Sequence, residues 1–98
     1  MMFKIDFTLE AIEDIRWFRK TDRKRVIEEI EKQLKHHPTQ ETRNRKKLRP
    51  NEIAEWELRV DKFRVFYDVD EDEEFVKIEA VGFKKGNKLF IHGEEYKL

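Results

Sequence analysis

Two arginines in a stretch of alternating apolar and charged residues are the first candidates for chemistry. The stretch "WELRVDKFRVFYDVD", residues 56–70, has the period of two that is typical of paired β-strands, with Asp61 and Lys62 near the expected turn. A two-residue turn there would place Arg59 directly opposite Arg64 on one face of the hairpin. Like charges at such a position destabilise a sheet, whereas two guanidinium groups held on rigid strands fit a phosphate.

The pattern leaves two interpretations of this pair open. In one, Glu55 and Glu57 neutralise the arginines in an exposed ion-pair network that contributes little free energy. In the other, the pair forms an anion site, with Glu57 diagonally next to it. Both depend on the turn, because a three-residue turn would shift the register and separate Arg59 from Arg64.

The formal net charge of zero conceals an uneven distribution along the chain. Residues 1–50 carry 14 Lys and Arg against 9 Asp and Glu, and residues 51–98 carry 8 against 13. The densest basic run, "RNRKKLR", contains Arg43, Arg45, Lys46, Lys47 and Arg49. A second basic run, "GFKKGNK", follows the last clear strand and contains Lys84, Lys85 and Lys88. These runs favour either a surface for a polyanion or ordinary solvated loops.

The residues that usually hold metals or form covalent intermediates are scarce. The chain has no cysteine and three histidines, and the adjacent His36 and His37 diverge at a predicted helix end. The acidic run at 68–79 has the spacing of a calcium loop, but Glu73 stands where that loop needs glycine. We therefore expect no metal and no cofactor. His92 and Tyr96 remain candidates for proton transfer that no pattern singles out.

The elements that must position these residues follow from hydrophobic periodicity. Residues 3–7 predict a strand; Thr8 then caps a helix whose apolar stripe is Leu9, Ile12, Ile15 and Phe18. Thr21 caps a second helix that continues through residue 34 and ends by Pro38. Three strands follow, at 56–60, 63–69 and 75–81.

This order predicts an α+β fold in a single domain, residues 1–98: an N-terminal strand, an α-helical hairpin, then an antiparallel β-meander packed on the helices. The opposite face of the sheet is expected to be open and to carry the polar set. Trp17 lies off the main stripe of its helix, so it fits a packing position or a partner-binding surface. No signal peptide or membrane-length apolar run is visible, which predicts a soluble, cytoplasmic protein.

Three segments in a fixed order carry a resemblance to a known family. They are "KKLR" at 46–49, "WELRVDKFRVFYDVD" at 56–70 and "AVGFKKGNKLF" at 80–90. Together with the leading strand and helical hairpin they resemble the RelE/ParE superfamily of toxins from bacterial and archaeal type II toxin–antitoxin modules. The resemblance covers nearly the whole chain and implies a compact toxin that a small antitoxin protein neutralises.

The resemblance also implies an activity. RelE-type toxins enter the ribosome and cleave messenger RNA without a metal, through attack of the 2′-hydroxyl on the adjacent phosphate. By this resemblance Arg64 would stabilise the transition-state charge, Lys84 would contact the phosphate or leaving group, and Arg59 would assist. The basic run and Lys85 and Lys88 would contact ribosomal RNA through its phosphates.

Two departures from the RelE pattern keep other activities open. Glu55 and Glu57 stand on a strand where relatives commonly carry basic residues, and Phe90 stands where they carry tyrosine or histidine. Glu57 is then the candidate base, with His92 as a more distant one. A ParE-like toxin that acts on DNA gyrase without hydrolysis, or a member that has lost catalysis and retains antitoxin binding, are the alternatives.

Overall fold

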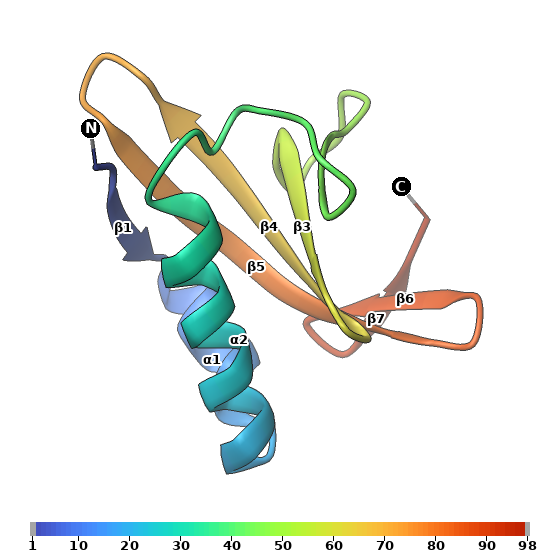
Figure 1. Ribbon diagram of the computed structural model, residues 1–98. Helices are drawn as coiled ribbons and strands as arrows, with labels where there is room; N and C mark the ends of the chain where they lie inside the picture. Colours follow the sequence, from blue (N-terminus) through green and yellow to red (C-terminus); the bar gives the residue numbers. More distant parts are fainter. Residues whose placement is uncertain (1, 98) are drawn as a thin grey trace.

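The computed structural model describes residues 2–97 and contains two helices and seven strands (Figure 1). The first half of the chain forms β1 (Lys4–Phe7), α1 (Leu9–Arg16), α2 (Lys20–Leu34) and β2 (Arg45–Lys47). The second half forms β3 (Trp56–Val60), β4 (Phe63–Asp70), β5 (Phe75–Lys85), β6 (Lys88–Ile91) and β7 (Glu94–Tyr96). No helix within residues 2–97 has the length and apolar character needed to cross a membrane.

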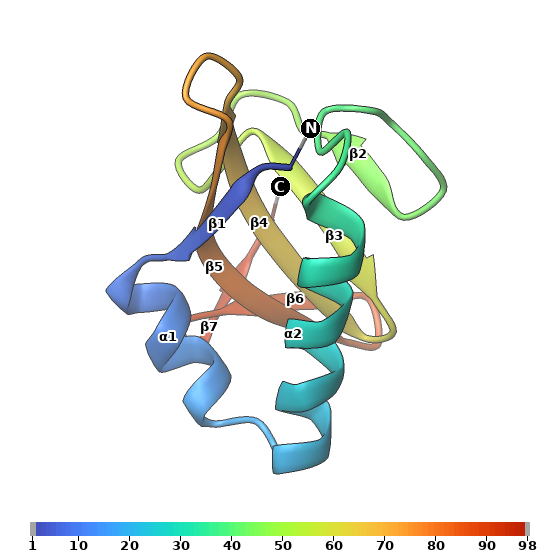
Figure 2. The same ribbon diagram turned by 60° about the vertical axis from the view of Figure 1, so that its left-hand side comes forward.

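All seven strands belong to one sheet. The order β2-β3-β4-β5-β6-β7 is antiparallel throughout, and β1 runs parallel to the first half of β5. Both helices lie on the same side of this sheet (Figure 2). The predicted α+β architecture is therefore confirmed, and β2, β6 and β7 extend the predicted meander at its two edges.

The two helices begin differently. Thr8 caps α1 as predicted, because its side-chain oxygen accepts a hydrogen bond from the backbone N–H of Ala11 at 3.0 Å. The prediction that Thr21 caps α2 is wrong: α2 already begins at Lys20, and its N-cap residue is Arg19. Pro38 is buried three residues beyond the C-cap residue Lys35, so α2 ends before the proline.

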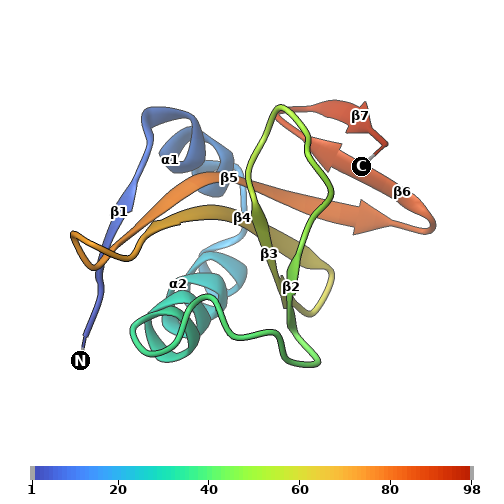
Figure 3. The same cartoon turned by 90° about the horizontal axis from the view of Figure 1, so that it is seen from above.

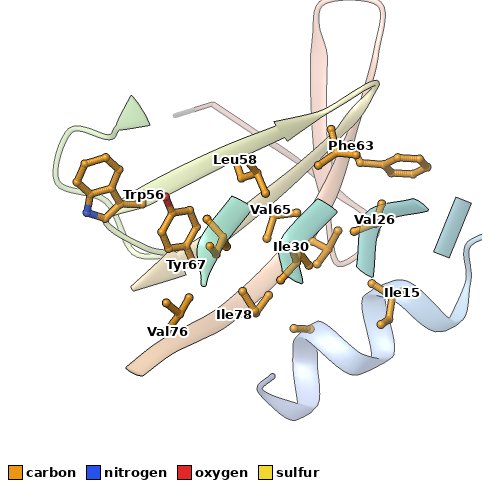
Figure 4. Packing of buried hydrophobic residues seen from close by; sticks show 14 residues of the cluster. Ile15, Val26, Ile30, Trp56, Leu58, Phe63, Val65, Tyr67, Val76 and Ile78 are labelled. Carbon is orange, nitrogen blue, oxygen red and sulfur yellow. The ribbon is translucent and has the colours of Figure 1, made fainter. Parts of the chain in front are cut away.

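The main core lies between the helices and the sheet (Figure 4). Alternate residues of the central strands point into it, namely Leu58, Val60, Phe63, Val65 and Tyr67. From the helices it receives Ala11, Ile15, Val26, Ile30 and Leu34. The alternation that predicted strands at 56–70 thus reflects burial of one face against the helices.

The apolar stripe predicted for α1 is only half correct. Leu9 is 79% exposed and Ile12 is 40% exposed, whereas Ala11, Asp14 and Ile15 are the buried residues of this helix. Because α1 packs mainly along β5, only a narrow strip of its surface is covered. Leu9 and Ile12 lie outside that strip.

The sequence had predicted that the opposite face of the sheet is open, but part of this face is covered. A second apolar cluster occupies part of it and is formed by Ala54, Phe66, Ala80, Leu89 and Ile91. The loop between β2 and β3 and the β6–β7 hairpin come together on this side, away from the helices (Figure 3). The part of this face nearest the β3–β4 turn carries Arg59 and Arg64, and Asp68 and Glu79 lie toward its other end.

A buried hydrogen bond joins the central strand to the segment that follows α2. The hydroxyl of Tyr67 donates to the carbonyl oxygen of Pro38 at 2.7 Å, and the Tyr67 ring stacks with Trp56 at a centroid distance of 6.2 Å. Burial raises the pKa of the Tyr67 hydroxyl. The hydroxyl therefore stays protonated as a donor and holds the loop over the core.

We expect Tyr67→Phe to lower the free energy of unfolding by about 1–3 kcal/mol, because it leaves the buried Pro38 carbonyl without its donor. Urea unfolding followed by circular dichroism measures the change. Tyr96→Phe is the matched control, since Tyr96 is only partly buried. Equal stability of the Tyr67→Phe and wild-type proteins would contradict this role.

Candidate functional site

The arginine pair forms as the register argument predicts. Val60 pairs with Phe63 across a two-residue turn, and Arg59 then pairs with Arg64. Residues directly opposite each other in a sheet point to the same face, so the two guanidinium side chains share one face. That face is the one turned away from the helices, because Phe63 and Val60 enter the main core.

Arg64 is held by the turn beside it. Its side chain is buried, with 8% of the residue exposed, and its Nη1 donates to the carbonyl oxygens of Asp61 at 2.8 Å and Phe63 at 2.9 Å. Burial lowers the pKa of Arg64, Glu57 opposes this shift, and Arg59 adds to it. An arginine remains charged despite such a shift. The site thus contains a fixed, partly desolvated cation.

Lys84 lies on the same face as the arginine pair. Arg64 pairs with Gly82 of β5, and Lys84 is two residues further along that strand. Its backbone N–H donates to the Lys62 carbonyl oxygen at 2.8 Å, while its side chain is exposed. Gly82 is required between them, because a Cβ there would lie 2.4 Å from the carbonyl oxygen of Phe90.

Glu57 is the carboxylate nearest in register to these cations. It pairs with Phe66 on one side and Lys46 on the other, so it shares the face of Arg59 and Arg64, and it is half-buried. Across residues 2–97, no carboxylate forms an ion pair within 4.0 Å of Arg59, Arg64 or Lys84. The structure thus leaves these three cations without the direct ion pairs that would neutralise them. We call Arg59, Arg64 and Lys84 the cation face.

The structure separates the two candidates for proton transfer. His92 lies on the helix side, where its Nδ1 is 2.7 Å from Oδ1 of the buried Asp14 on α1. Tyr96 lies on the other side: it pairs with Leu89, which pairs with Lys84. Tyr96 therefore shares the face of Lys84, and His92 does not. The sequence did not reveal this difference because it depends on how β6 pairs with β5 and β7.

The residues of the basic run before β3 do not all lie on one exposed surface. Arg45 donates through Nη1 to the carbonyl oxygen of Gln33 at 2.5 Å and through Nε to that of Gln40 at 3.2 Å. The first bond holds its guanidinium against the end of α2, and the second holds it against the loop that follows. Lys46 shares the face of Glu57. The other predicted RNA-contacting residues with exposed side chains are Arg43, Lys47, Arg49, Lys85 and Lys88.

The described residues contain no group of three or more His, Cys, Asp or Glu that is arranged to hold a metal ion. The groups that this surface offers for chemistry are the three cations and the single carboxyl and hydroxyl groups beside them. A cationic cluster on rigid strands is suited to holding a phosphate and stabilising negative charge that develops on it.

A pair of carboxyl groups, Asp68 and Glu79, lies away from the cation face and was not found from the sequence. The register skips Glu79 between Ile78 and Ala80, which makes it the extra residue of a β-bulge. Burial first, and then the neighbouring Asp68 carboxyl, raise the pKa of Glu79 to about 7. Asp68 in turn accepts a hydrogen bond from the backbone N–H of Glu55 at 2.8 Å.

Glu79 should make the protein less stable as the pH rises. The folded state keeps this proton between pH 4.5 and about 7, whereas the unfolded chain loses it near 4.5, so raising the pH favours unfolding. We expect Glu79→Gln to raise the free energy of unfolding at pH 8 by about 1 kcal/mol, after allowance for solvent screening, and to change it little at pH 4.

Urea titrations of wild type and variant at several pH values measure the difference, and Glu73→Gln in the neighbouring exposed turn is the control. A Glu79→Gln effect that does not depend on pH would contradict the raised pKa.

The comparisons with known proteins concern the family and the fold. No curated protein sequence matches the chain. Among solved structures, the toxin–antitoxin complex RelBE2 from Mycobacterium tuberculosis contains a chain similar to this one, with a TM-score of 0.75 and 23% identity, covering 86% of this chain and 93% of that one. The family model for the ParE toxin of type II toxin–antitoxin systems matches residues 5–85. The chain therefore belongs to this toxin family, which confirms its resemblance to the RelE/ParE superfamily.

Proposed function

We propose that this toxin is a ribosome-dependent, metal-independent messenger-RNA endonuclease that inhibits translation. The observation that carries the proposal is the cation face: Arg59 directly opposite Arg64, with Lys84 on the same side of the sheet. Placing like charges together costs stability. A phosphate that binds between them would offset that cost.

The chemistry assigned to the site is an in-line attack within the RNA. The 2′-hydroxyl oxygen bonds to the adjacent phosphorus and gives its proton to a base, while the bond from phosphorus to the 5′-oxygen breaks. The products are a cyclic phosphate and a 5′-hydroxyl, whose oxygen takes a proton from an acid. Arg64 and Arg59 stabilise the charge on the phosphorane oxygens, and Lys84 contacts the phosphate or leaving oxygen.

Proton transfer is assigned to residues on the same face. Glu57 is the base, because its half-buried carboxylate lies beside the arginine pair. Tyr96 is favoured over His92 as the second proton carrier, since it shares the face of Lys84. Phe90 cannot take this role and points toward Phe83, with which it stacks at 5.5 Å.

The partners follow from the same assignment. Exposed cations at Arg43, Lys46, Lys47, Arg49, Lys85 and Lys88 would contact ribosomal RNA through phosphates, which position the protein without reading sequence. Arg45 contributes less to this surface because its guanidinium is engaged with α2. A cognate antitoxin is the protein partner, and the cytoplasm, where ribosomes are, is the site of action.

A second candidate function is inhibition of DNA gyrase without hydrolysis. The family model that matches the chain is named for ParE toxins, and that mode of action needs no proton carrier. The cation face would then bind a protein or DNA surface and cleave nothing. A toxin fold that has lost catalysis and retains only antitoxin binding is the third outcome to be tested.

We expect Arg64→Ala to abolish growth arrest upon induced expression and to remove transcript cleavage at ribosomal A-site codons, because it deletes the buried cation. Primer extension on transcripts from induced cells measures cleavage. Arg64→Lys keeps the positive charge and should retain part of the activity. Arg16→Ala, which removes an exposed cation on α1, should remain fully active.

Circular dichroism shows whether the Arg64 variants fold, since Arg64 also donates to the turn carbonyls. Full toxicity of a folded Arg64→Ala protein would contradict the assigned site. DNA breaks with continuing translation would favour the gyrase alternative. Soluble expression of the wild-type protein without growth arrest would favour the alternative in which the toxin has lost catalysis and retains only antitoxin binding.

A further inference from the structure

The connection between the two helices carries a cluster of cations apart from the cation face and from the basic run before β3. Residues 16–25 contain six Lys and Arg residues against one acid, Asp22. This segment ends α1 and begins α2, and it protrudes beyond the sheet (Figure 2). A local excess of positive charge at a protruding tip attracts polyanions.

Half of these cations are free of ion pairs. The others are engaged in the pairs Arg16–Glu13, Lys24–Glu28, Arg25–Glu29 and Arg25–Asp61. Within residues 2–97, no carboxylate forms an ion pair within 4.0 Å of Arg19, Lys20 or Arg23. Residues three and four apart are neighbours on a helix, so the first turn of α2 brings these three together. We call Arg19, Lys20 and Arg23 the tip cations.

Trp17 stands beside the tip cations. It is the C-cap residue of α1, two residues before Arg19, and it is 87% exposed. Tryptophan is highly buried on average, whereas here its aromatic ring is open to solvent. A positively charged surface with an exposed aromatic ring is typical of proteins that bind single-stranded nucleic acid, because any base can stack on the ring.

The β3–β4 turn lies between the tip and the cation face. Phe18 stacks with Phe63 at a centroid distance of 4.5 Å, which packs the helix connection against the start of β4. Lys62, in the turn itself, is exposed and lines the same surface groove as Arg19. Its carbonyl oxygen accepts the backbone N–H of Lys84 at 2.8 Å. Cations therefore follow one another from the tip, over the turn, to the cation face.

We propose that the tip binds a single-stranded segment of RNA, with phosphates on the tip cations and one base stacked on Trp17. RNA as the partner rests on the proposed function, since phosphate contacts and stacking suit any single strand. The surface itself rests on the tip cations and on Trp17. A duplex keeps its bases stacked inside and leaves Trp17 without a partner. The tip adds affinity at a point away from the reacting phosphate.

The probe is a 2′-O-methyl oligouridine of about twelve nucleotides, within the size range of known single-strand sites. Its methyl groups block the attacking 2′-hydroxyl, so the whole toxin cannot cleave it by the proposed reaction. Anisotropy of an end-labelled strand measures affinity at several salt concentrations. Quenching of Trp17 fluorescence by the unlabelled strand measures stacking. Trp56 is 7% exposed in the core and should not respond.

The charge test combines Arg19→Ala, Lys20→Ala and Arg23→Ala. This variant should reduce the slope of log affinity against log salt by about 2, because each phosphate contact with a single strand contributes about 0.7. It removes no helix cap, since Arg19 makes no capping hydrogen bond, and circular dichroism checks folding. The matched control removes three exposed cations away from the tip and should keep the slope; it combines Lys4→Ala, Lys32→Ala and Lys97→Ala.

The stacking test is Trp17→Leu. This variant should bind the strand at least about fivefold more weakly, because it loses the ring on which a base stacks. Leu9→Ala is the matched control, since Leu9 is a 79% exposed apolar residue of the same helix without an aromatic ring. It should bind like wild type.

Equal salt slopes in the two triple variants would overturn the proposal, because binding would then follow net charge alone. Equal affinity of Trp17→Leu and wild type would overturn it, as would equal binding of a duplex or binding only to vesicles of anionic phosphatidylglycerol. Arg64→Ala should keep the quenching of Trp17. If transcript cleavage needs Arg64 but the tip variants bind like wild type, the tip proposal alone fails. If the strand binds at the tip and no transcript is cleaved, the endonuclease proposal alone fails.

Discussion

The pairing register of β3 and β4 is the constraint on which the rest of the site depends. The two-residue turn pairs Val60 with Phe63, and this places Arg59 opposite Arg64. The same turn points two carbonyl oxygens at Nη1 of Arg64. Those dipoles offset part of the repulsion between the guanidinium groups. A shift of one residue in β4 would instead turn Arg64 into the core, where no partner could compensate its charge.

Strand β5 then separates two surfaces of different chemistry. Its successive residues point alternately to the helix side and away from it, so Val81 and Phe83 line an apolar groove while Gly82 and Lys84 belong to the cation face. Glu10 and Glu13 of α1 lie on the helix side of the sheet, and the arginine pair lies on the other side. This separation keeps the α1 carboxylates away from the arginine pair, beside which Glu57 is the nearest carboxylate in register.

Buried polar contacts of α1 hold β5 in this position. Asp14 accepts from the Val81 backbone N–H and contacts His92, so it ties the helix to both the strand and the β6–β7 turn. Burial raises the pKa of Asp14, and the Val81 and His92 hydrogen bonds oppose that shift. The Thr8 hydroxyl adds a bond to the carbonyl oxygen of Glu79 at the bulge. These contacts position the groove and the cation face relative to each other. Asp14, Val81 and His92 also line the groove, whereas none of them belongs to the cation face.

The sequence by itself determined the order of a strand, two helices and a three-stranded meander, because hydrophobic periodicity is a local property of the chain. It was compatible with a two-residue turn between β3 and β4, and the structure then established that turn and with it the arginine pair. Only the tertiary structure decided which surfaces are covered. It left Leu9 exposed, engaged Arg45 with α2, and placed His92 and Tyr96 on opposite sides of the sheet. These outcomes depend on contacts between segments far apart in the chain, such as Asp14 with His92, and no local pattern encodes such contacts.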